Sequence, residues 1–301
     1  MMLDFSIIAP TYERPASLAQ LLHSITLMDY PSERFEVIVI DDGGSAPLEE
    51  LVSMFRDHFQ VRLLRQGNLG PAAARNHAAR EAGGRYLAFT DDDCRPGADW
   101  LREFRQALQQ APAAVCGGRT TNLYTGNLPA QATQLLMDYL YENYNPTHTA
   151  GAFFPTNNMS VPRDEFLALG GFDEQLRFGE DREFCYRWQS RGGLFVYAPQ
   201  AVVQHGHRLS LGEFVRLHFL YGGGTSAFRI ACKRKGMRAV DFSSPFWYFS
   251  LLLYGLKREP GRRGFALSLL LAGSQAATLA GLTWASLARP GGEDPGNDET
   301  H

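Results

Sequence analysis

The sequence predicts an α/β fold: a Rossmann-type, mostly parallel sheet with helices on both faces, followed by a C-terminal helical extension. Short apolar runs alternate with stretches of helical periodicity along residues 5–108, and this alternation is typical of parallel strands joined by crossover helices. The chain has 301 residues, of which 45% are hydrophobic, so it can bury a large core. This length indicates one large domain or two medium ones.

The expected elements of the first half follow in strict alternation. Apolar runs predict strands at 5–9, 35–40, 61–64 and 86–90. Apolar spacing predicts helices at 16–27, 48–55, 70–83 and 100–108.

The second half is less regular. Residues 120–155 are rich in Tyr, Asn and Thr, and we expect an insertion or acceptor-facing segment there. Beyond it, helices are expected at 164–169 and 179–192, and a strand pair around Pro199 at 195–203.

Composition excludes several classes of function. The net charge of −3, with both signs interspersed, gives no argument for nucleic-acid binding. The four cysteines are far apart, which favours reduced thiols in a reducing compartment. No signal peptide is visible, so we expect a cytoplasmic protein. Dinucleotide (GxGxxG), phosphate-loop (GxxxxGK[ST]) and nucleophile-elbow (GxSxG) motifs are absent from the sequence.

Polar side chains follow three of the predicted strands, where ligands bind in open α/β sheets. They are Pro10-Thr11-Tyr12, Asp41-Asp42 and Asp91-Asp92-Asp93. In extended chain, Asp91 and Asp93 point the same way, and their oxygens suit Mg²⁺ or Mn²⁺ bridging a diphosphate. A solvated acidic loop is the alternative. Asp41 and Asp42 fit either a hydrogen bond to a base or ribose, or a turn before Gly43-Gly44.

Three further residues could take part in chemistry. Arg75 lies near the start of a helix, where guanidinium and backbone N–H groups both favour phosphate. Asp181 opens another helix, whose dipole favours an ionised carboxylate and hence a general base. His205, beside His207, is either a metal ligand or an ordinary loop histidine.

Taken in order, seven motifs resemble those of family 2 glycosyltransferases of GT-A fold, over residues 3–210. They are SIIAPTYER at 6–14, VIVIDDGGS at 37–45, NLGPAAARN at 68–76, FTDDD at 89–93, NNMS at 157–160, GGFDE at 170–174 and GED at 179–181. Each motif alone is weak, but unrelated chains seldom reproduce their order and spacing together.

The resemblance implies a role for each matching residue. Pro10, Thr11, Tyr12 and Glu13 correspond to nucleotide contacts, together with the Asp41/Asp42 pair, Asp92 and, on the diphosphate side, Arg75. Asp93 is the implied metal ligand, with Asp91 nearer the ribose and His205 in the place of a histidine ligand. Asp181 is the implied base, and Glu180 touches the donor or acceptor sugar. Glu13 departs from the family pattern, because Asn is commoner there.

These roles imply a metal-assisted single displacement with inversion, using Mn²⁺ or Mg²⁺ and a nucleotide-sugar donor. A UDP-sugar is favoured over GDP- and dTDP-sugars, and a glycan or lipid-linked acceptor is expected. The implied division is a catalytic domain at 1–210 (donor half 1–118, acceptor half 119–210), a helical region at 211–289 and a disordered tail at 290–301. A sugar-nucleotide pyrophosphorylase and a non-catalytic nucleotide-sugar-binding membrane protein are the alternatives.

The C-terminal region suggests a membrane location. Residues 264–288 contain no charged side chain, which is long enough for a transmembrane helix. Basic residues precede this segment and acidic ones follow it, which places the catalytic domain at the inner face of the membrane. Gly273, Ala277 and Gly281 form a small-residue face for helix packing. Because serines and threonines dilute the hydrophobicity, a soluble hairpin or a homodimer interface is the alternative.

Overall fold

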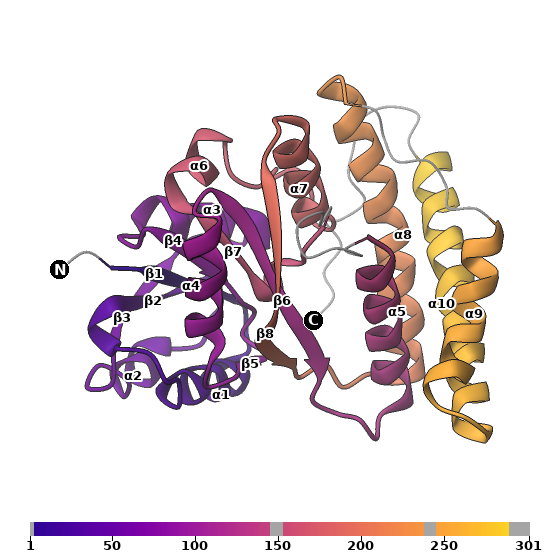
Figure 1. Cartoon of the computed structure of the whole chain (residues 1–301), viewed down its shortest axis with the longest axis horizontal. Coiled ribbons are helices and arrows are strands. Elements are labelled where there is room, and N and C mark those ends of the chain that lie inside the picture. The colour runs from indigo at the N-terminus through magenta and orange to yellow at the C-terminus, as the bar shows by residue number, and fades with distance from the viewer. Residues whose placement is uncertain (1–2, 145–152, 238–244, 289–301) are drawn as a thin grey trace. The chain divides into compact units, whose positions relative to one another are not determined.

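The protein contains one eight-stranded sheet, with strand order β3-β2-β1-β4-β7-β6-β8-β5 (Figure 1). The structure is a computed structural model that describes residues 3–144, 153–237 and 245–288. The strands are β1 (Phe5–Thr11), β2 (Phe35–Asp41), β3 (Gln60–Arg65), β4 (Tyr86–Phe89), β5 (Cys94–Pro96), β6 (Ala114–Asn122), β7 (Met159–Pro162) and β8 (Leu194–His205).

The first half of the sheet is parallel. Strand β1 pairs with β2 and β4, and β2 pairs with β3. The connecting helices are α1 (Pro15–Thr26), η1 (Ser32–Arg34), α2 (Leu48–Ser53) and α3 (Pro71–Glu81). The succession of strands reverses between β1 and β4, and such a switch point opens a crevice at the carboxyl ends of the strands.

Helices cover both faces of this sheet, as the sequence predicts. Successive side chains of a strand point to opposite faces. Ile7 packs in a core with α1 and α4 (Trp100–Gln110), whereas Ile8 packs in a second core with α3, α6 (Arg163–Ala168) and α7 (Glu180–Ser190). The four cysteines are free and buried.

The second half of the sheet is mixed. Strands β7 and β5 pair antiparallel with their neighbours, while β6 and β8 are parallel. The expected strand pair around Pro199 is a single strand, β8. Its register with β6 jumps from Gly118–Ala198 to Arg119–Val202, so Pro199 lies in a bulge, where its missing N–H breaks no ladder bond.

Two elements within the expected insertion at 120–155 were not predicted. Strand β6 extends to Asn122, and helix α5 covers Leu128–Tyr144. The start of α5 has a sequence signal, because Asn127 precedes Leu128-Pro129 and its side chain accepts the Ala130 N–H at 2.9 Å. Residues 145–152 of the segment lie outside the described residues, and so does the predicted tail at 290–301.

The chain divides into two compact units. The first comprises residues 1–123, 140–174 and 181–207, and the second comprises 124–139, 175–180 and 208–301. The first unit holds the sheet and η2 (Thr156–Asn158), and the second holds α8 (Leu211–Arg234), α9 (Pro245–Arg258) and α10 (Arg262–Leu287).

Close backbone contact joins α8 to α10. A Cβ atom added at Gly281 would lie 1.9 Å from the Phe219 carbonyl oxygen, and one at Gly222 would lie 2.0 Å from the Thr278 oxygen. Small residues on α10 therefore allow this packing, as predicted for Ala277 and Gly281, which are buried. Gly273 is exposed and does not belong to the packed face.

Candidate active site

The Asp triplet forms a tight turn at the switch point, directly after β4. The Cys94 N–H donates to the Asp91 carbonyl oxygen at 3.0 Å and closes this turn. Asp91 and Asp93 keep partly exposed carboxylates. Both carboxylates thus lie at the strand end, as the sequence predicts, but a turn brings them there and not the extended chain that was expected.

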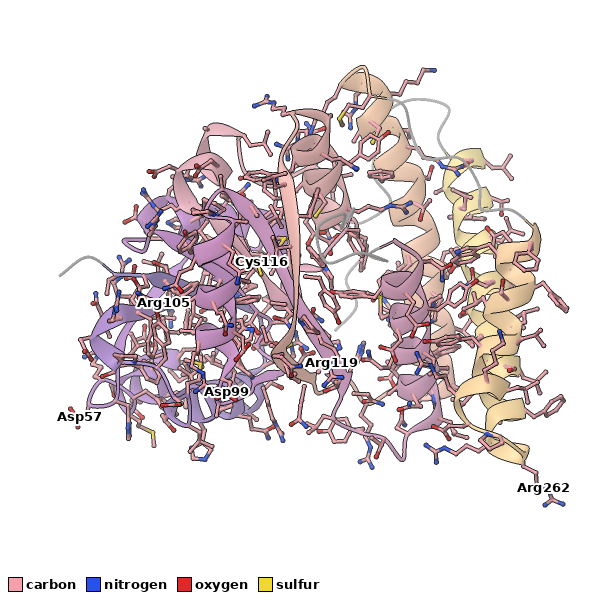
Figure 2. All side chains as sticks on the ribbon, viewed as in Figure 1. Asp57, Asp99, Arg105, Cys116, Arg119 and Arg262 are labelled. Carbon is pink, nitrogen blue, oxygen red and sulfur yellow. The ribbon has the colours of Figure 1, made fainter. Side chains whose placement is uncertain are left out.

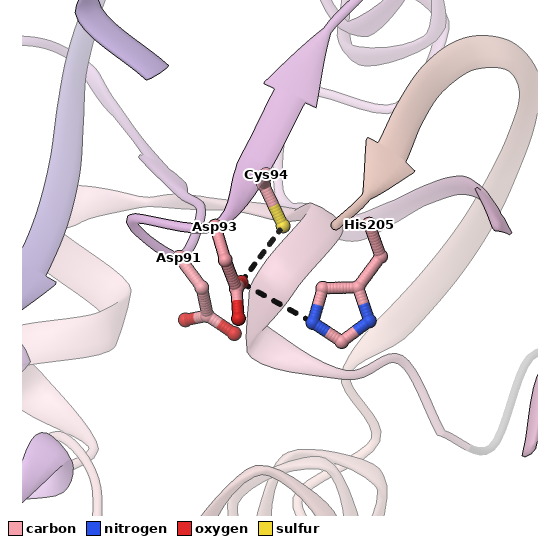
Figure 3. A group of neighbouring side chains, drawn as sticks. All are labelled: Asp91, Asp93, Cys94 and His205. Atoms are coloured by element: carbon pink, nitrogen blue, oxygen red, sulfur yellow. Dashed lines mark hydrogen bonds and ion pairs between the residues drawn. The ribbon is translucent and has the colours of Figure 1, made fainter. Parts of the chain in front are cut away.

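Pairing of β5 with β8 brings His205 to this turn. Cys94 lies opposite His205 in the antiparallel register, and the Gly206 N–H donates to the Asp93 carbonyl oxygen at 2.8 Å. As a result, His205 Nε2 lies 3.2 Å from Asp93 Oδ1. Ligand atoms of Asp91, Asp93, Cys94 and His205 all lie within 4.8 Å of one another (Figure 3).

The donor set of this cluster fits a hard divalent cation. The two carboxylates suit Mn²⁺ or Mg²⁺, and the imidazole nitrogen suits a transition metal such as Mn²⁺ better than Mg²⁺. Burial works against ionisation of Asp93, but His205 and Arg14 outweigh it and lower the pKa of that carboxyl. Burial also raises the pKa of the Cys94 thiol well above its usual value, so Cys94 stays protonated and is a poor ligand.

The pKa of the His205 imidazole is shifted as well. Burial disfavours its charge, but the Asp93 carboxylate raises the pKa of His205 overall. A histidine ligand must be neutral, so His205 would have to give up its imidazole proton to hold a metal ion.

Arg75 and Asp181 face the same cluster from α3 and α7. Arg75 is buried, and its Nη2 donates to Asp91 Oδ1 at 2.6 Å. Burial raises the pKa of Asp181, although the N–H groups of Arg182 and Thr156 and the charge of Arg75 act in the opposite direction. The helix start was expected to favour the ionised carboxylate. Desolvation is the larger effect here, so the pKa of Asp181 lies above the ordinary value of an aspartate. The role of Asp181 as a base stays a prediction.

Arg14 was not among the candidate residues predicted from the sequence, but it forms ion pairs with two carboxylates of the Asp triplet. Its Nη2 lies 2.7 Å from Asp92 Oδ1, and its Nη1 lies 3.0 Å from Asp93 Oδ2. Thr11 Oγ1 donates to the other oxygen of Asp92 at 2.7 Å. Burial raises the pKa of the fully buried Asp92 to about 7, against Arg14 and Thr11. Asp92 thus links the ends of β1 and β4, and the motif at 6–14 was the only signal for Arg14.

Asp41 and Asp42 shape the rim beside this turn. Asp41 Oδ1 accepts the Gly44 N–H at 2.8 Å. Asp42 accepts the N–H groups of Leu69 at 3.0 Å and Gly70 at 2.8 Å. Both carboxylates are buried and adopt the turn-forming role, one of the two alternatives. Donor contact by the same pair stays a prediction.

The loop after β1 contains a strained residue. Among the residues that the structure describes, Glu13 is the non-glycine residue with a positive φ, at 53°. Its Oε1 accepts the Ser45 N–H at 2.7 Å, which ties the β1 loop to the β2 loop. Backbone strain of this kind persists only where other contacts fix it. Tyr12, beside it, is 42% exposed, and Pro10 is half-buried.

We expect Glu13→Asn to weaken donor binding up to about tenfold, because asparagine tolerates a positive φ but is too short to reach Ser45. Glu13→Gln keeps an acceptor of the same length and serves as the matched control. Calorimetric titration with a nucleotide sugar measures the effect, and thermal unfolding checks the fold. If both variants bound the nucleotide sugar with equal affinity, the hydrogen bond between Glu13 and Ser45 would not be needed to order the loops after β1 and β2.

Glu180 is the first residue of α7 and is buried. It belongs to the segment 175–180 of the second compact unit, whereas Asp181 belongs to the first. The predicted contact of Glu180 with a sugar stays a prediction.

The open sheet and the acidic cluster at its switch point are typical of α/β proteins that bind a ligand at the carboxyl ends of their strands. Residues 6–167, more than half of the chain, match the family model of glycosyl transferase family 2. The protein belongs to this family. The predicted family is therefore confirmed, and the pyrophosphorylase alternative loses its support.

Several characterised proteins are similar in sequence. The pre-mycofactocin glycosyltransferase of Mycobacterium tuberculosis is 26% identical over 75% of this chain and 48% of its own length. Glycosyltransferase AglE of Haloferax volcanii is 26% identical over 73% of this chain and 72% of its own. The validoxylamine A glucosyltransferase of Streptomyces hygroscopicus is 30% identical over 62% and 48%. The chain spans about half the length of two of these relatives.

Solved structures share the fold. The mannosyltransferase PcManGT of Pyrobaculum calidifontis, in complex with GDP-Man and Mn²⁺, matches 97% of this chain and 77% of its own, with a TM-score of 0.62 and 18% identity. TarS residues 1–349 of S. aureus, in complex with UDP-GlcNAc, match 95% and 91%, with a TM-score of 0.59 and 15% identity. The predicted GT-A-like α/β class is confirmed.

Proposed function

We propose that this protein transfers a sugar from a nucleoside-diphosphate donor to a hydroxyl acceptor, by metal-assisted single displacement with inversion. The observation that carries the proposal is the convergence of Asp93, His205, Asp91 and Arg75 at the switch point, with Asp181 beside them. Both solved structures named above are complexes with a nucleotide sugar.

The donor side of the proposal uses the loops after β1, β2 and β4. Pro10, Thr11, Tyr12 and Glu13 line the base side together with Asp41 and Asp42. Asp93 and His205 are the residues that would hold Mn²⁺ or Mg²⁺, with Asp91 and Arg75 next to them. When bound, such an ion would neutralise the charge of the leaving diphosphate.

The acceptor side of the proposal depends on Asp181. Its carboxylate takes the proton of the acceptor hydroxyl while that oxygen attacks the anomeric carbon from the face opposite the leaving group. One displacement inverts the configuration, and no protein nucleophile is needed. Contact of Glu180 with the donor or acceptor sugar is part of the same proposal.

We further propose that the enzyme works at the inner face of the cell membrane on a glycan or lipid-linked acceptor. Within the described residues, α10 is a helix long and apolar enough to cross a membrane, by length and composition only. An acceptor in cell-envelope glycan or glycolipid synthesis is found at that surface.

A donor panel tests the proposed activity. UDP-, GDP- and dTDP-sugars are each incubated with Mn²⁺ or Mg²⁺, and nucleoside diphosphate release and thermal stabilisation are measured. One donor class should raise the melting temperature only with metal present, and EDTA should abolish turnover. Release of pyrophosphate, or stabilisation by no nucleotide sugar, would contradict the proposal.

A further inference from the structure

Helices α9 and α10 run side by side in the second unit (Figure 1). Both helices leave apolar side chains exposed. On α9 these recur at helical spacing: Phe246, Phe249, Leu253 and Leu256. On α10 the exposed large residues are Phe265, Leu269, Leu279, Trp284 and Leu287. Exposure reaches 76% for Phe246, 61% for Trp284 and 80% for Leu287. We call these nine residues the apolar face.

Three hydroxyls around the apolar face bond within their own helices. The hydroxyl of Ser250 donates to the Phe246 carbonyl oxygen one turn earlier in α9. On α10, Thr283 donates to the Leu279 oxygen at 3.0 Å, and Ser286 donates to the Leu282 oxygen at 2.8 Å. Because these three hydroxyls bond within their own helices, they cost little in an apolar environment.

The opposite side of α10 packs along α8. Phe214 shares a core with Leu271, Gly222 contacts Thr278, and Ser226, further along α8, lines a groove with Leu282. The two helices are therefore parallel neighbours. Helix α8 carries Arg216 and Arg229 along the same length. If α10 crossed a bilayer, it would draw these charges into hydrocarbon, which is unfavourable.

Basic residues stand at both ends of this helical layer. The turn between α9 and α10 carries Lys257, Arg258, Arg262 and Arg263 against one carboxylate, Glu259. Arg262 points away from the start of α10 (Figure 2). The end of α8, near the end of α10, carries Lys233, Arg234 and Lys235. If two copies packed through the apolar face, basic ends would meet basic ends in both the parallel and the antiparallel arrangement. Anionic headgroups instead complement the charge of these ends.

We propose that the apolar face docks on the surface of an anionic lipid bilayer, with α9 and α10 lying in the headgroup–acyl boundary and not crossing it. The aromatic and leucine side chains insert, and the basic ends contact headgroups. This inference deepens the membrane location in the proposed function by naming the surface, the mode of binding and the lipid charge.

Flotation of the full chain with phosphatidylcholine vesicles, with or without about 30% phosphatidylglycerol, tests the surface. Binding to the anionic vesicles is expected, and it should weaken as salt is raised. The double variant Phe249→Glu/Trp284→Glu should bind at least about tenfold more weakly, since both rings lose their burial. Lys257→Gln/Arg262→Gln should also lose about tenfold, and only with anionic vesicles.

The matched control is Met54→Glu, which places the same charge on an exposed apolar residue of the first unit and should bind vesicles like the wild type. Alkaline carbonate should release the bound protein. The proposal would be overturned if the protein stayed on the vesicles after carbonate, or if it bound no vesicles. It would also be overturned if the wild type formed a dimer that dissociates in Phe249→Glu/Trp284→Glu. Donor hydrolysis in vesicle-free buffer should be unchanged in all of these variants, so failure of the proposed activity is seen separately.

Discussion

Replacing Asp181 with asparagine should lower turnover by about 10²- to 10⁴-fold, because the substitution keeps the shape of the side chain but removes the proton acceptor. Donor affinity should stay close to that of the wild type, since the base acts on the acceptor hydroxyl. Steady-state kinetics with the donor found in the panel, together with calorimetric donor titration, measure both quantities. A parallel collapse of donor binding would instead make Asp181 a donor or structural residue.

The pH dependence gives a second test of the same residue. Burial raises the pKa of Asp181, and the base must be deprotonated to act. As the pH is lowered, kcat/KM should therefore begin to decrease at a pH above the ordinary pKa range of an aspartate. In Asp181→Asn this limb should disappear from the residual activity, whereas a limb that persists would belong to another group.

Replacing Asp93 with alanine should abolish metal-dependent donor binding and lower turnover by about 10³-fold or more, because metal-ion stabilisation of the leaving diphosphate is worth several kcal/mol. The fold should persist, since Asp93 lies in a turn at the rim of the sheet and its ionic contacts are with Arg14 and His205, which are themselves partly exposed. Thermal shift with and without Mn²⁺ and donor measures binding, and nucleoside diphosphate release measures turnover.

Two further variants calibrate the Asp93 result. His205→Ala should cause a smaller loss, because water can complete the shell of a hard cation. Asp57→Ala removes an exposed carboxylate after α2 (Figure 2) and should behave like the wild type. Full activity of Asp93→Ala in EDTA would remove the metal from the proposed mechanism.

The sequence by itself determined the parallel half of the fold and the identity of most candidate residues. Strand-forming runs such as 35–40 are buried along their length in the structure, and local periodicity is sufficient to find them. The Asp triplet could be found from the sequence because polar residues that directly follow a buried strand lie at the end of that strand, where ligands bind. The ordered motifs then indicated the family, which the family model confirms.

Only the tertiary structure decided how the site is assembled. Pairing of Cys94 with His205 joins segments far apart in the chain, and local pattern carries no information about such a pairing. Burial is likewise a property of the whole packed site, and it raises the pKa of Asp181, an effect that the position at a helix start does not reveal. Arg14 acquired its partners only when β1 and β4 became neighbours. The packing of α10 on α8 has the same origin, because a single apolar segment does not reveal which of its faces other helices will cover.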